Sequence, residues 1–271
     1  MASACYVYAI VDRAAATLPH SLTGINGEPL MLATWQALAA VTSATGEAKI
    51  APRAALLVRH QAVVEVLCQI TPTLPVRFGT VLPDVTSVVK ALEDHNDTFV
   101  ADLKRIGGKQ EIAVTVLWDT PENSIQGNSN DTNDLDDTNH AGMDHVFAEE
   151  KGRGTRYLLT RKEAYQRYQG AHEKAQAVIT DLNTILRPYV CESRYTFSSK
   201  PKPSVRAAYL LAPEMLVRLR TALARYQAQR RAIQLLVTGP WPPYSFVSIP
   251  NGPMSGAEER AMRDDGAPLG A

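Results

Sequence analysis

The 271-residue sequence is short of the features that mark secreted and membrane proteins. It has only three cysteines, Cys5, Cys68 and Cys191, too few and too far apart for a disulfide framework or a four-ligand zinc site, so we interpret them as buried thiols. No segment approaches the ~20 consecutive apolar residues that span a membrane, and the first residues lack the basic start and apolar run of a secretion signal. We therefore expect a cytoplasmic chain with no membrane partner.

Residue patterns typical of catalytic sites are also scarce. Gly107 to Gln110 lacks the earlier glycine and the hydroxyl residue after lysine that a phosphate-binding loop needs. His140 and His145 lie in an acidic stretch, where solvated side chains explain them better than weak metal chelation. His60 and His95 fall on apolar helix faces, which favours packing roles over a catalytic pair across the core. The sequence predicts no enzyme, and no catalytic, cofactor or metal site.

The charges balance overall but not along the chain. Lys plus Arg and Asp plus Glu number 9 and 11 in residues 1–119, none and 8 in 120–150, and 19 and 9 in 151–271, giving nets of −2, −8 and +10. The middle block is poor in apolar residues, and such a composition does not offset its own ordering entropy. We predict a first domain at 1–119, a flexible acidic linker at 120–153, a second domain at 154–248 and a disordered tail at 249–271.

The first domain reads as a compact α+β unit. Apolar spacing predicts a helix over Ala54–Ile70 and a second helix that Asp84 caps and Gly107 ends. Strand-like runs are expected at 5–11, 30–34, 36–43, 73–82 and 112–118. We expect a ferredoxin-like domain, with the helices packed on one face of a largely antiparallel sheet.

The second domain is predicted to be α+β as well. A long helix over about 156–188 precedes strands near 191–197 and 205–211, a helix from Pro213, and a last strand that Gly239 and Pro240 break. The long helix would pack on a small antiparallel sheet. The similar layout of the two domains suggests duplicated architecture without a residue-level repeat.

Nucleic-acid binding is an alternative function, because a ferredoxin-like sheet can stack bases and the second domain is basic. An RNA-recognition sheet displays aromatic residues on its central strands, however, and Val76 to Thr80 supplies only Phe78. The arginines are spread along predicted helices instead. We keep an RNA-binding module as the alternative and expect no nucleic-acid partner.

The segment from Leu235 to Val247 is the most distinctive. Its prolines at 240, 242 and 243 stiffen the backbone, so Trp241, Tyr244 and Phe246 are presented at low conformational entropy. Such rings either close over their own core or form a docking surface. Arg77 and Phe78 join them as candidate protein-binding residues, although for Arg77 we favour a structural role, with a buried or half-buried guanidinium bonded to backbone carbonyls, over a partner contact.

Six blocks, in order, resemble the gas vesicle protein F/L family (GvpF/GvpL): 6–11, 38–43, 74–81, 157–162, 207–210 and 238–246. The resemblance implies a non-enzymatic minor component of gas vesicles with a modified ferredoxin-like N-terminal domain and a second α+β domain. It implies binding to the small apolar major shell protein and, as further partners, to other gas vesicle accessory proteins. We expect sheet-edge and aromatic contacts that limit shell-protein aggregation during nucleation and assembly.

Overall fold

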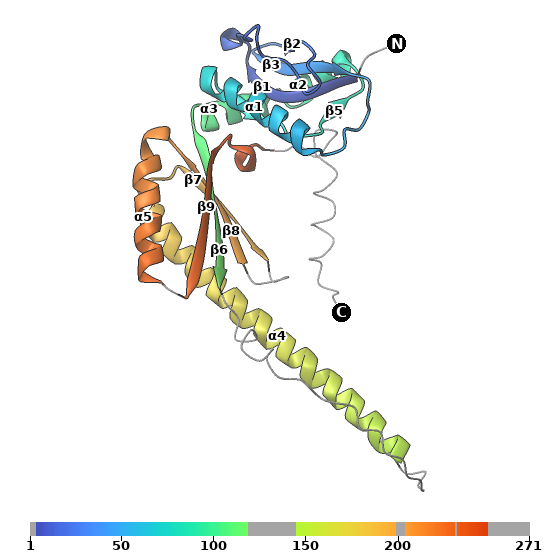
Figure 1. The fold of residues 1–271 in the computed structure, drawn as a ribbon, viewed down its shortest axis with the longest axis vertical. Helices are drawn as coiled ribbons and strands as arrows, with labels where there is room; N and C mark the ends of the chain where they lie inside the picture. Colours follow the sequence, from blue (N-terminus) through green and yellow to red (C-terminus); the bar gives the residue numbers. More distant parts are fainter. Residues whose placement is uncertain (1–3, 119–144, 199–203, 231, 249–271) are drawn as a thin grey trace.

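The computed structural model describes residues 4–118, 145–198, 204–230 and 232–248. The described residues form an α+β protein with two antiparallel sheets (Figure 1), which confirms the predicted fold class at this level. Most of the predicted acidic linker, at 120–144, and the predicted tail at 249–271 lie outside the described residues. Among the helices that are described, none combines the length and apolar character needed to cross a membrane.

The first sheet is built around strand β1 (Ala4–Asp12). β1 pairs with β3 (Leu38–Thr45), which also pairs with β2 (Met31–Trp35); on its other side β1 pairs with β4 (Thr73–Pro75) and β5 (Val81–Leu82). The short 3-10 helix η1 (Arg13–Ala15) follows β1. Seven consecutive residues of β1, from Cys5 to Val11, are buried. A strand buried on both faces reads as a continuous apolar run, as this one does.

Helices cover both faces of this sheet, so the expectation of helices on one face is wrong. α1 (Ala54–Ile70) packs over Tyr6 and Tyr8 in one apolar cluster, and its bounds agree with the sequence prediction. α2 (Val85–Asp94) and α3 (Asn96–Ile106) pack over the opposite cluster, which contains Val7 and Ile10. The physical reason is β1 itself, whose apolar side chains alternate between two buried faces.

The second predicted helix begins as expected but is divided. Asp84 is its N-cap, since its Oδ1 accepts a hydrogen bond of 2.7 Å from the Ser87 backbone N–H. The helix then breaks at His95, whose φ of −122° and ψ of 17° are not helical. The His95 ring packs edge-on against Phe99 of α3.

The second sheet has the strand order β7-β8-β6-β9. It consists of β6 (Gln110–Trp118), β7 (Glu192–Ser198), β8 (Ser204–Leu211) and β9 (Ile233–Trp241). β6 was predicted to belong to the first domain, but it is a central strand here and pairs with β8 and β9 along its length. The predicted boundary at residue 119 therefore falls on the wrong side of β6.

The helices of the second unit lie on one face of its sheet. α4 (His145–Leu186) begins inside the range predicted as linker and projects far beyond the sheet (Figure 1), while its last turns pack through Ala175, Val178, Leu182 and Leu186. The 3-10 helix η3 (Pro213–Met215) leads into α5 (Leu216–Gln229) on the same face. We call the opposite side of this sheet the open face; it carries Thr196, Arg206, Thr115, Leu236, Leu117 and Gln234.

The two units contact each other at one end of the open face. Leu210 of β8 belongs to the same apolar cluster as Phe99, Leu103 and Ile106 of α3. β9 does not end at Gly239 as predicted but runs to Trp241, past a register shift between Glu111 and Ala113. After β9, the 3-10 helix η4 (Tyr244–Phe246) enters the junction between the units.

Candidate functional site

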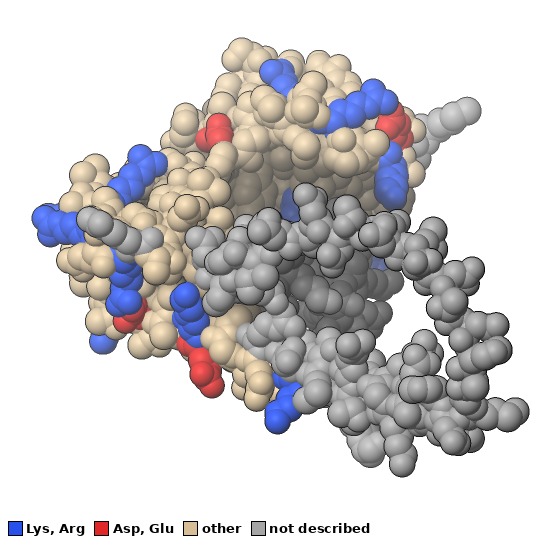
Figure 2. All heavy atoms as spheres, turned by 60° about the horizontal axis from the view of Figure 1, so that its bottom comes forward, with Lys and Arg blue, Asp and Glu red and all other residues tan. Residues whose placement is uncertain are grey.

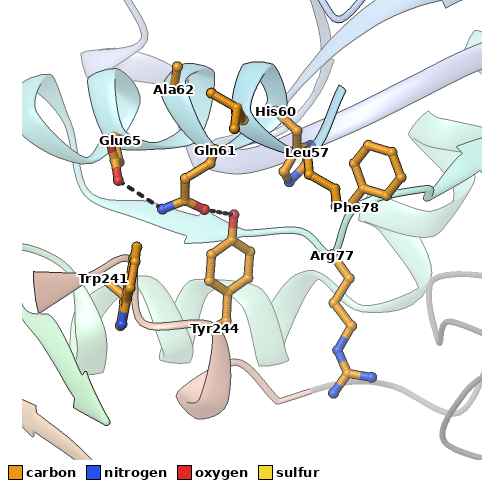
Figure 3. A pocket seen from close by; sticks show the side chains of 10 residues that line it. Leu57, His60, Gln61, Ala62, Glu65, Arg77, Phe78, Trp241 and Tyr244 are labelled. Carbon is orange, nitrogen blue, oxygen red and sulfur yellow. Dashed lines mark hydrogen bonds between the residues drawn. The ribbon is translucent and has the colours of Figure 1, made fainter. Parts of the chain in front are cut away.

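A pocket of about 640 Å³ lies where the two units meet. Its walls are α1, the turn after β4, and the end of β9 with the segment that follows it, so it joins parts of the chain more than 150 residues apart. Four of the five predicted binding residues line it, Arg77, Phe78, Trp241 and Tyr244, together with Leu57, Val58, His60, Gln61, Ala62 and Glu65 (Figure 3). The structure thus brings the two predicted sequence blocks into one site.

The α1 wall is the part that the sequence analysis missed. Leu57 and Val58 are exposed apolar residues, and Val58 is the more exposed of the two, at 70%. Both lie outside the buried stripe of the helix. Two adjacent apolar residues away from that stripe were the sequence feature that could have identified this wall of the pocket. Among the described residues of α1 they add aliphatic surface beside the aromatic rings.

Tyr244 crosses the pocket from η4 to α1 (Figure 3). Its hydroxyl donates a hydrogen bond of 3.2 Å to Gln61 Oε1, and Gln61 Nε2 donates one of 3.0 Å to Glu65 Oε1. Burial, with smaller effects of Cys68, Tyr6 and Glu65, raises the pKa of the Tyr244 phenol, which therefore stays neutral and acts as the donor. This chain of bonds fixes the ring across the interior of the pocket.

His60 and Tyr6 hold the floor of the pocket. His60 Nε2 lies 3.0 Å from the Val76 carbonyl oxygen, which can only accept, so Nε2 carries the proton. Nδ1 then accepts from the Tyr6 hydroxyl at 2.9 Å, and the Tyr6 oxygen accepts from the Gly79 N–H at 3.1 Å. Desolvation by burial, partly offset by the bond to Val76, lowers the pKa of His60 to about 4.

This network positions Phe78 and gives His60 a structural role. Because Val76 and Gly79 flank Arg77 and Phe78, the bonds to His60 and Tyr6 fix the turn between them. The Phe78 ring meets the His60 and Tyr6 rings edge-on, with centroids 5.8 and 6.1 Å apart. A pairing of His60 with His95 is wrong, because α1 and the α2–α3 pair lie on opposite faces of the sheet.

Trp241 forms the far side of the pocket and is 41% exposed. Its indole Nε1 donates to Thr238 Oγ1 at 3.3 Å. Gly239 precedes it with φ of +106°, where a Cβ would come within 2.8 Å of the Glu111 carbonyl oxygen. Glycine is therefore needed to bring the chain close to β6 and turn Trp241 into the pocket.

Two buried carboxylates anchor the segment that follows. Glu111 accepts from the backbone N–H and the hydroxyl of Ser245 at 2.8 and 2.7 Å. Asp102 accepts from the same two groups of Ser248 at 2.6 and 3.1 Å and pairs with Arg105 at 2.6 Å. Arg105 also donates to the Phe246 carbonyl at 2.5 Å. The segment is thus fixed to both units by charge-assisted bonds.

Phe246 and Arg77 differ from their expected environments. Phe246 is 0% exposed and belongs to the core cluster, with the Arg194 guanidinium 5.4 Å from its ring centroid, so it packs within the molecule and cannot contact a partner. Arg77, for which a buried or half-buried guanidinium was favoured, is exposed at the pocket rim and extends away from α1 (Figure 3). The rings of the aromatic segment thus differ in environment: Phe246 packs in the core, whereas Trp241 is exposed.

The cysteines are not all buried thiols. Cys5 is buried and Cys68 half-buried, but Cys191 is exposed, because it lies outside β7 at the surface. Burial raises the pKa of Cys5, and it raises that of Cys68 to about 12. Among the described residues no group of three or more His, Cys, Asp and Glu could hold a metal ion; His140 lies outside them, and so does the side chain of His145.

The open face lacks the surface that RNA recognition needs. On the central strands β6 and β8, its positions hold Ala113, Thr115, Leu117, Arg206 and Ala208, none of them aromatic. The aromatic residues of these strands, Trp118 and Tyr209, are buried against α4 and α5. Base stacking on aromatic rings, the basis of single-stranded RNA recognition by such sheets, has no platform on these strands.

Comparison with known proteins identifies the family. The model of the gas vesicle synthesis protein GvpL/GvpF family matches residues 4–248, a span that includes every wall of the pocket. The chain belongs to this family. It therefore has a role in gas vesicle formation, and the GvpL/GvpF family is not an enzyme family.

Relatives and solved structures agree with this GvpL/GvpF assignment. The chain is 30% identical over 268 residues to gas vesicle protein L of a Streptomyces species, covering 90% of this chain and 92% of that protein. It is 27% identical to gas vesicle protein L1 of Halobacterium salinarum, covering 89% of each. The crystal structure of GvpF from Anabaena matches with a TM-score of 0.64 at 18% identity, over 92% of this chain and 98% of the other. GvpF from Microcystis aeruginosa gives 0.62 at 18%, over 91% and 100%.

Proposed function

We propose that this protein binds the small apolar major shell protein of gas vesicles at the pocket, limits its aggregation and delivers it during vesicle nucleation and growth. The observation that carries the proposal is the pocket itself. It combines family blocks 74–81 and 238–246 in one site and exposes Leu57, Val58 and Trp241 together. Contacts with other gas vesicle accessory proteins belong to the same proposal.

The physical basis is the match between the site and an apolar client. An assembly subunit with exposed apolar surface aggregates unless that surface is covered. Large, rigid aromatic side chains in a pocket carry a disproportionate share of binding energy, because they bury much area and lose little side-chain entropy. Trp241 and Tyr244 meet this description, since Tyr244 is tied to Gln61 and Trp241 to Thr238.

We also propose that both units are ferredoxin-like, the first in a modified form. In each sheet the second strand in chain order lies at one edge, followed by the third, the first and the fourth. The second unit has the full element order β-α-β-β-α-β of such folds. The first lacks a long helix between its first and second strands, where only η1 occurs. This supports the predicted duplicated architecture.

A binding assay with the purified shell protein tests the pocket. Trp241→Ala should weaken binding at least tenfold, which is the loss of ~1.4 kcal/mol or more expected for an aromatic anchor. Val217→Ala is the control, because Val217 is exposed on α5 outside the pocket, and it should bind like the wild type. A folded Trp241→Ala protein that binds the shell protein with unchanged affinity would show that the pocket is not the binding site.

A further inference from the structure

The apolar surface of the pocket continues along β9 onto the open face. Trp241 is hydrogen-bonded to Thr238, and Leu236, two residues further along the same side of the strand, is 58% exposed. Leu236 lies opposite Thr115, and Leu117 follows Thr115 on the same face of β6 and is exposed too. An exposed apolar path thus connects α1 of the first unit with the middle of the second sheet.

An occupant of this surface docks on the sheet face rather than on the edge of β9. Side chains of α5 already bond three outward backbone groups of β9: Gln227 bonds the Ile233 carbonyl at 2.8 Å and the Leu235 N–H at 2.7 Å, and Arg220 bonds the Gly239 carbonyl at 2.7 Å. A strand added at this edge would have to displace them.

The sheet face limits the backbone conformation that a bound segment can adopt. The backbone groups of the central strands β6 and β8 are used in their ladders, and those of β9 that point toward β6 are used in the β6–β9 ladder, so this face offers no backbone partners to another chain. A segment lying there must satisfy its own N–H and C=O groups as its backbone loses water. An α-helix does so within itself, and an amphipathic helix also supplies the apolar stripe.

The described charges along the path favour an acidic occupant. Arg206 is exposed on the open face, between Thr196 on one side and Thr115 on the other. Arg77 is exposed at the pocket rim, whereas the acidic lining residue Glu65 is half-buried and accepts a bond from Gln61. On the side of the molecule seen in Figure 2, Lys and Arg atoms are more prominent than Asp and Glu atoms among the described residues.

We propose that the pocket and the open face form one groove for an amphipathic helix of the shell subunit, with its apolar stripe on Trp241 and Leu236 and its acidic flank beside Arg206. This inference rests on the proposed function and adds to it the form and charge of the bound segment. Opposite charges across such a groove fix the orientation of the helix and speed its capture.

Two synthetic peptides of about 20 residues, each able to form a helix of ~30 Å, test the inference with the full chain. Both carry the same leucines at i, i+3, i+4 and i+7; one has glutamates on its flanks and the other lysines. Fluorescence anisotropy should give a dissociation constant at least tenfold lower for the acidic peptide. Arg206→Glu should abolish this preference, and Leu236→Ser should weaken both peptides several-fold.

Arg218→Glu is the matched control, because it makes the same charge change on the exposed side of α5, and it should leave the preference intact. Equal binding of the two peptides, or an unchanged preference in Arg206→Glu, would overturn the inference. So would a tenfold gain in acidic-peptide affinity on removing residues 249–271, which would make the tail of this chain the occupant.

Failure of the inference is distinguishable from failure of the proposed function. If Trp241→Ala loses the shell protein while Arg206→Glu and Leu236→Ser bind it normally, the pocket is the site and the groove over the open face is wrong. If Trp241→Ala binds the shell protein normally, the proposed function itself is wrong. If all three variants lose affinity and Arg218→Glu does not, both are supported.

Discussion

His60 supports the pocket floor as a neutral imidazole that donates to Val76 and accepts from Tyr6. A proton on Nδ1 would replace the acceptor by a donor and place a charge among the rings of Tyr6, Tyr8 and Phe78. Burial therefore lowers its pKa to about 4, from the 6.5 of an unperturbed histidine. The residue is conspicuous in the sequence as a possible catalyst, and its surroundings explain why it is a packing residue.

The His60 pKa predicts a specific pH dependence of stability. Below pH 6.5 the unfolded chain binds a proton at His60 that the folded chain does not bind until about pH 4, so the free energy of unfolding falls as pH falls through this window. The loss should be on the order of 3 kcal/mol. Urea unfolding at pH 7 and pH 4.5 measures it, and His60→Gln should remove this part of the dependence. An identical pH dependence in the variant would contradict the assignment.

The three cysteines should differ in reactivity with a thiol reagent. Cys191 is exposed, whereas burial protects Cys5, and Cys68 has a pKa of about 12 that leaves it protonated. Because the thiolate is the reactive form, Ellman's reagent at pH 8 should quickly titrate one thiol in the folded protein and three in urea. Cys191→Ser should remove the fast reaction. Rapid reaction of a second thiol in the native protein would show that the core is more open than described.

For single residues, the sequence predicts which of them share a site but not the direction in which each side chain points. Trp241, Tyr244 and Phe246 share one rigid segment, yet the first is exposed, the second crosses the pocket and the third is in the core. Their directions depend on Glu111 and Asp102, carboxylates more than 130 residues earlier in the chain. No local pattern contains that information.

Among the elements, α3 controls how the segment after β9 is held. Asp102 is 3% exposed and bonds Ser248 and Arg105, so Asp102→Ala would leave the Ser248 N–H and hydroxyl without this acceptor. Arg105 is 35% exposed and keeps Glu192 as a partner, so the expected cost is that of the hydrogen bonds lost to a buried carboxylate, about 2 kcal/mol. Urea unfolding should show this loss, with Lys104→Ala on the exposed side of α3 changing stability by less than ~0.5 kcal/mol. Similar stabilities of the two variants would rule out an anchoring role for Asp102.

Elements set by local patterns were predicted well, and those set by distant contacts were not. α1 has the predicted bounds because its apolar spacing and flanking Pro52 and Pro72 are local signals. The break at His95 was missed because the apolar spacing runs on through it. β9 was expected to end at Gly239, but its pairing with β6 continues to Trp241 through a register shift that only the partner strand reveals.

For the whole molecule, strand pairing decides where one unit ends and the next begins. The acidic composition of 120–150 suggested a boundary after β6, but β6 lies between β8 and β9, which are more than 80 residues further along the chain. Composition shows where a chain is unsuited to a core; it does not show which sheet a preceding strand joins. One end of the open face then links the two units, through Leu210 of β8 and Phe246 of η4.

This placement of β6 predicts different behaviour for two fragments. Residues 110–248 contain all four strands of the second sheet and should unfold cooperatively in urea, although exposure of Leu210 and Phe246 should reduce stability. Residues 120–248 lack β6, so β8 and β9 have no strand between them and the apolar cores of α4 and α5 lose Ile112, Val114 and Val116. That fragment should be aggregated or lack a cooperative transition. Near-ultraviolet circular dichroism with urea titration distinguishes the two, and cooperative unfolding of 120–248 would restore the boundary at 119, because it would mean that the second unit folds without β6.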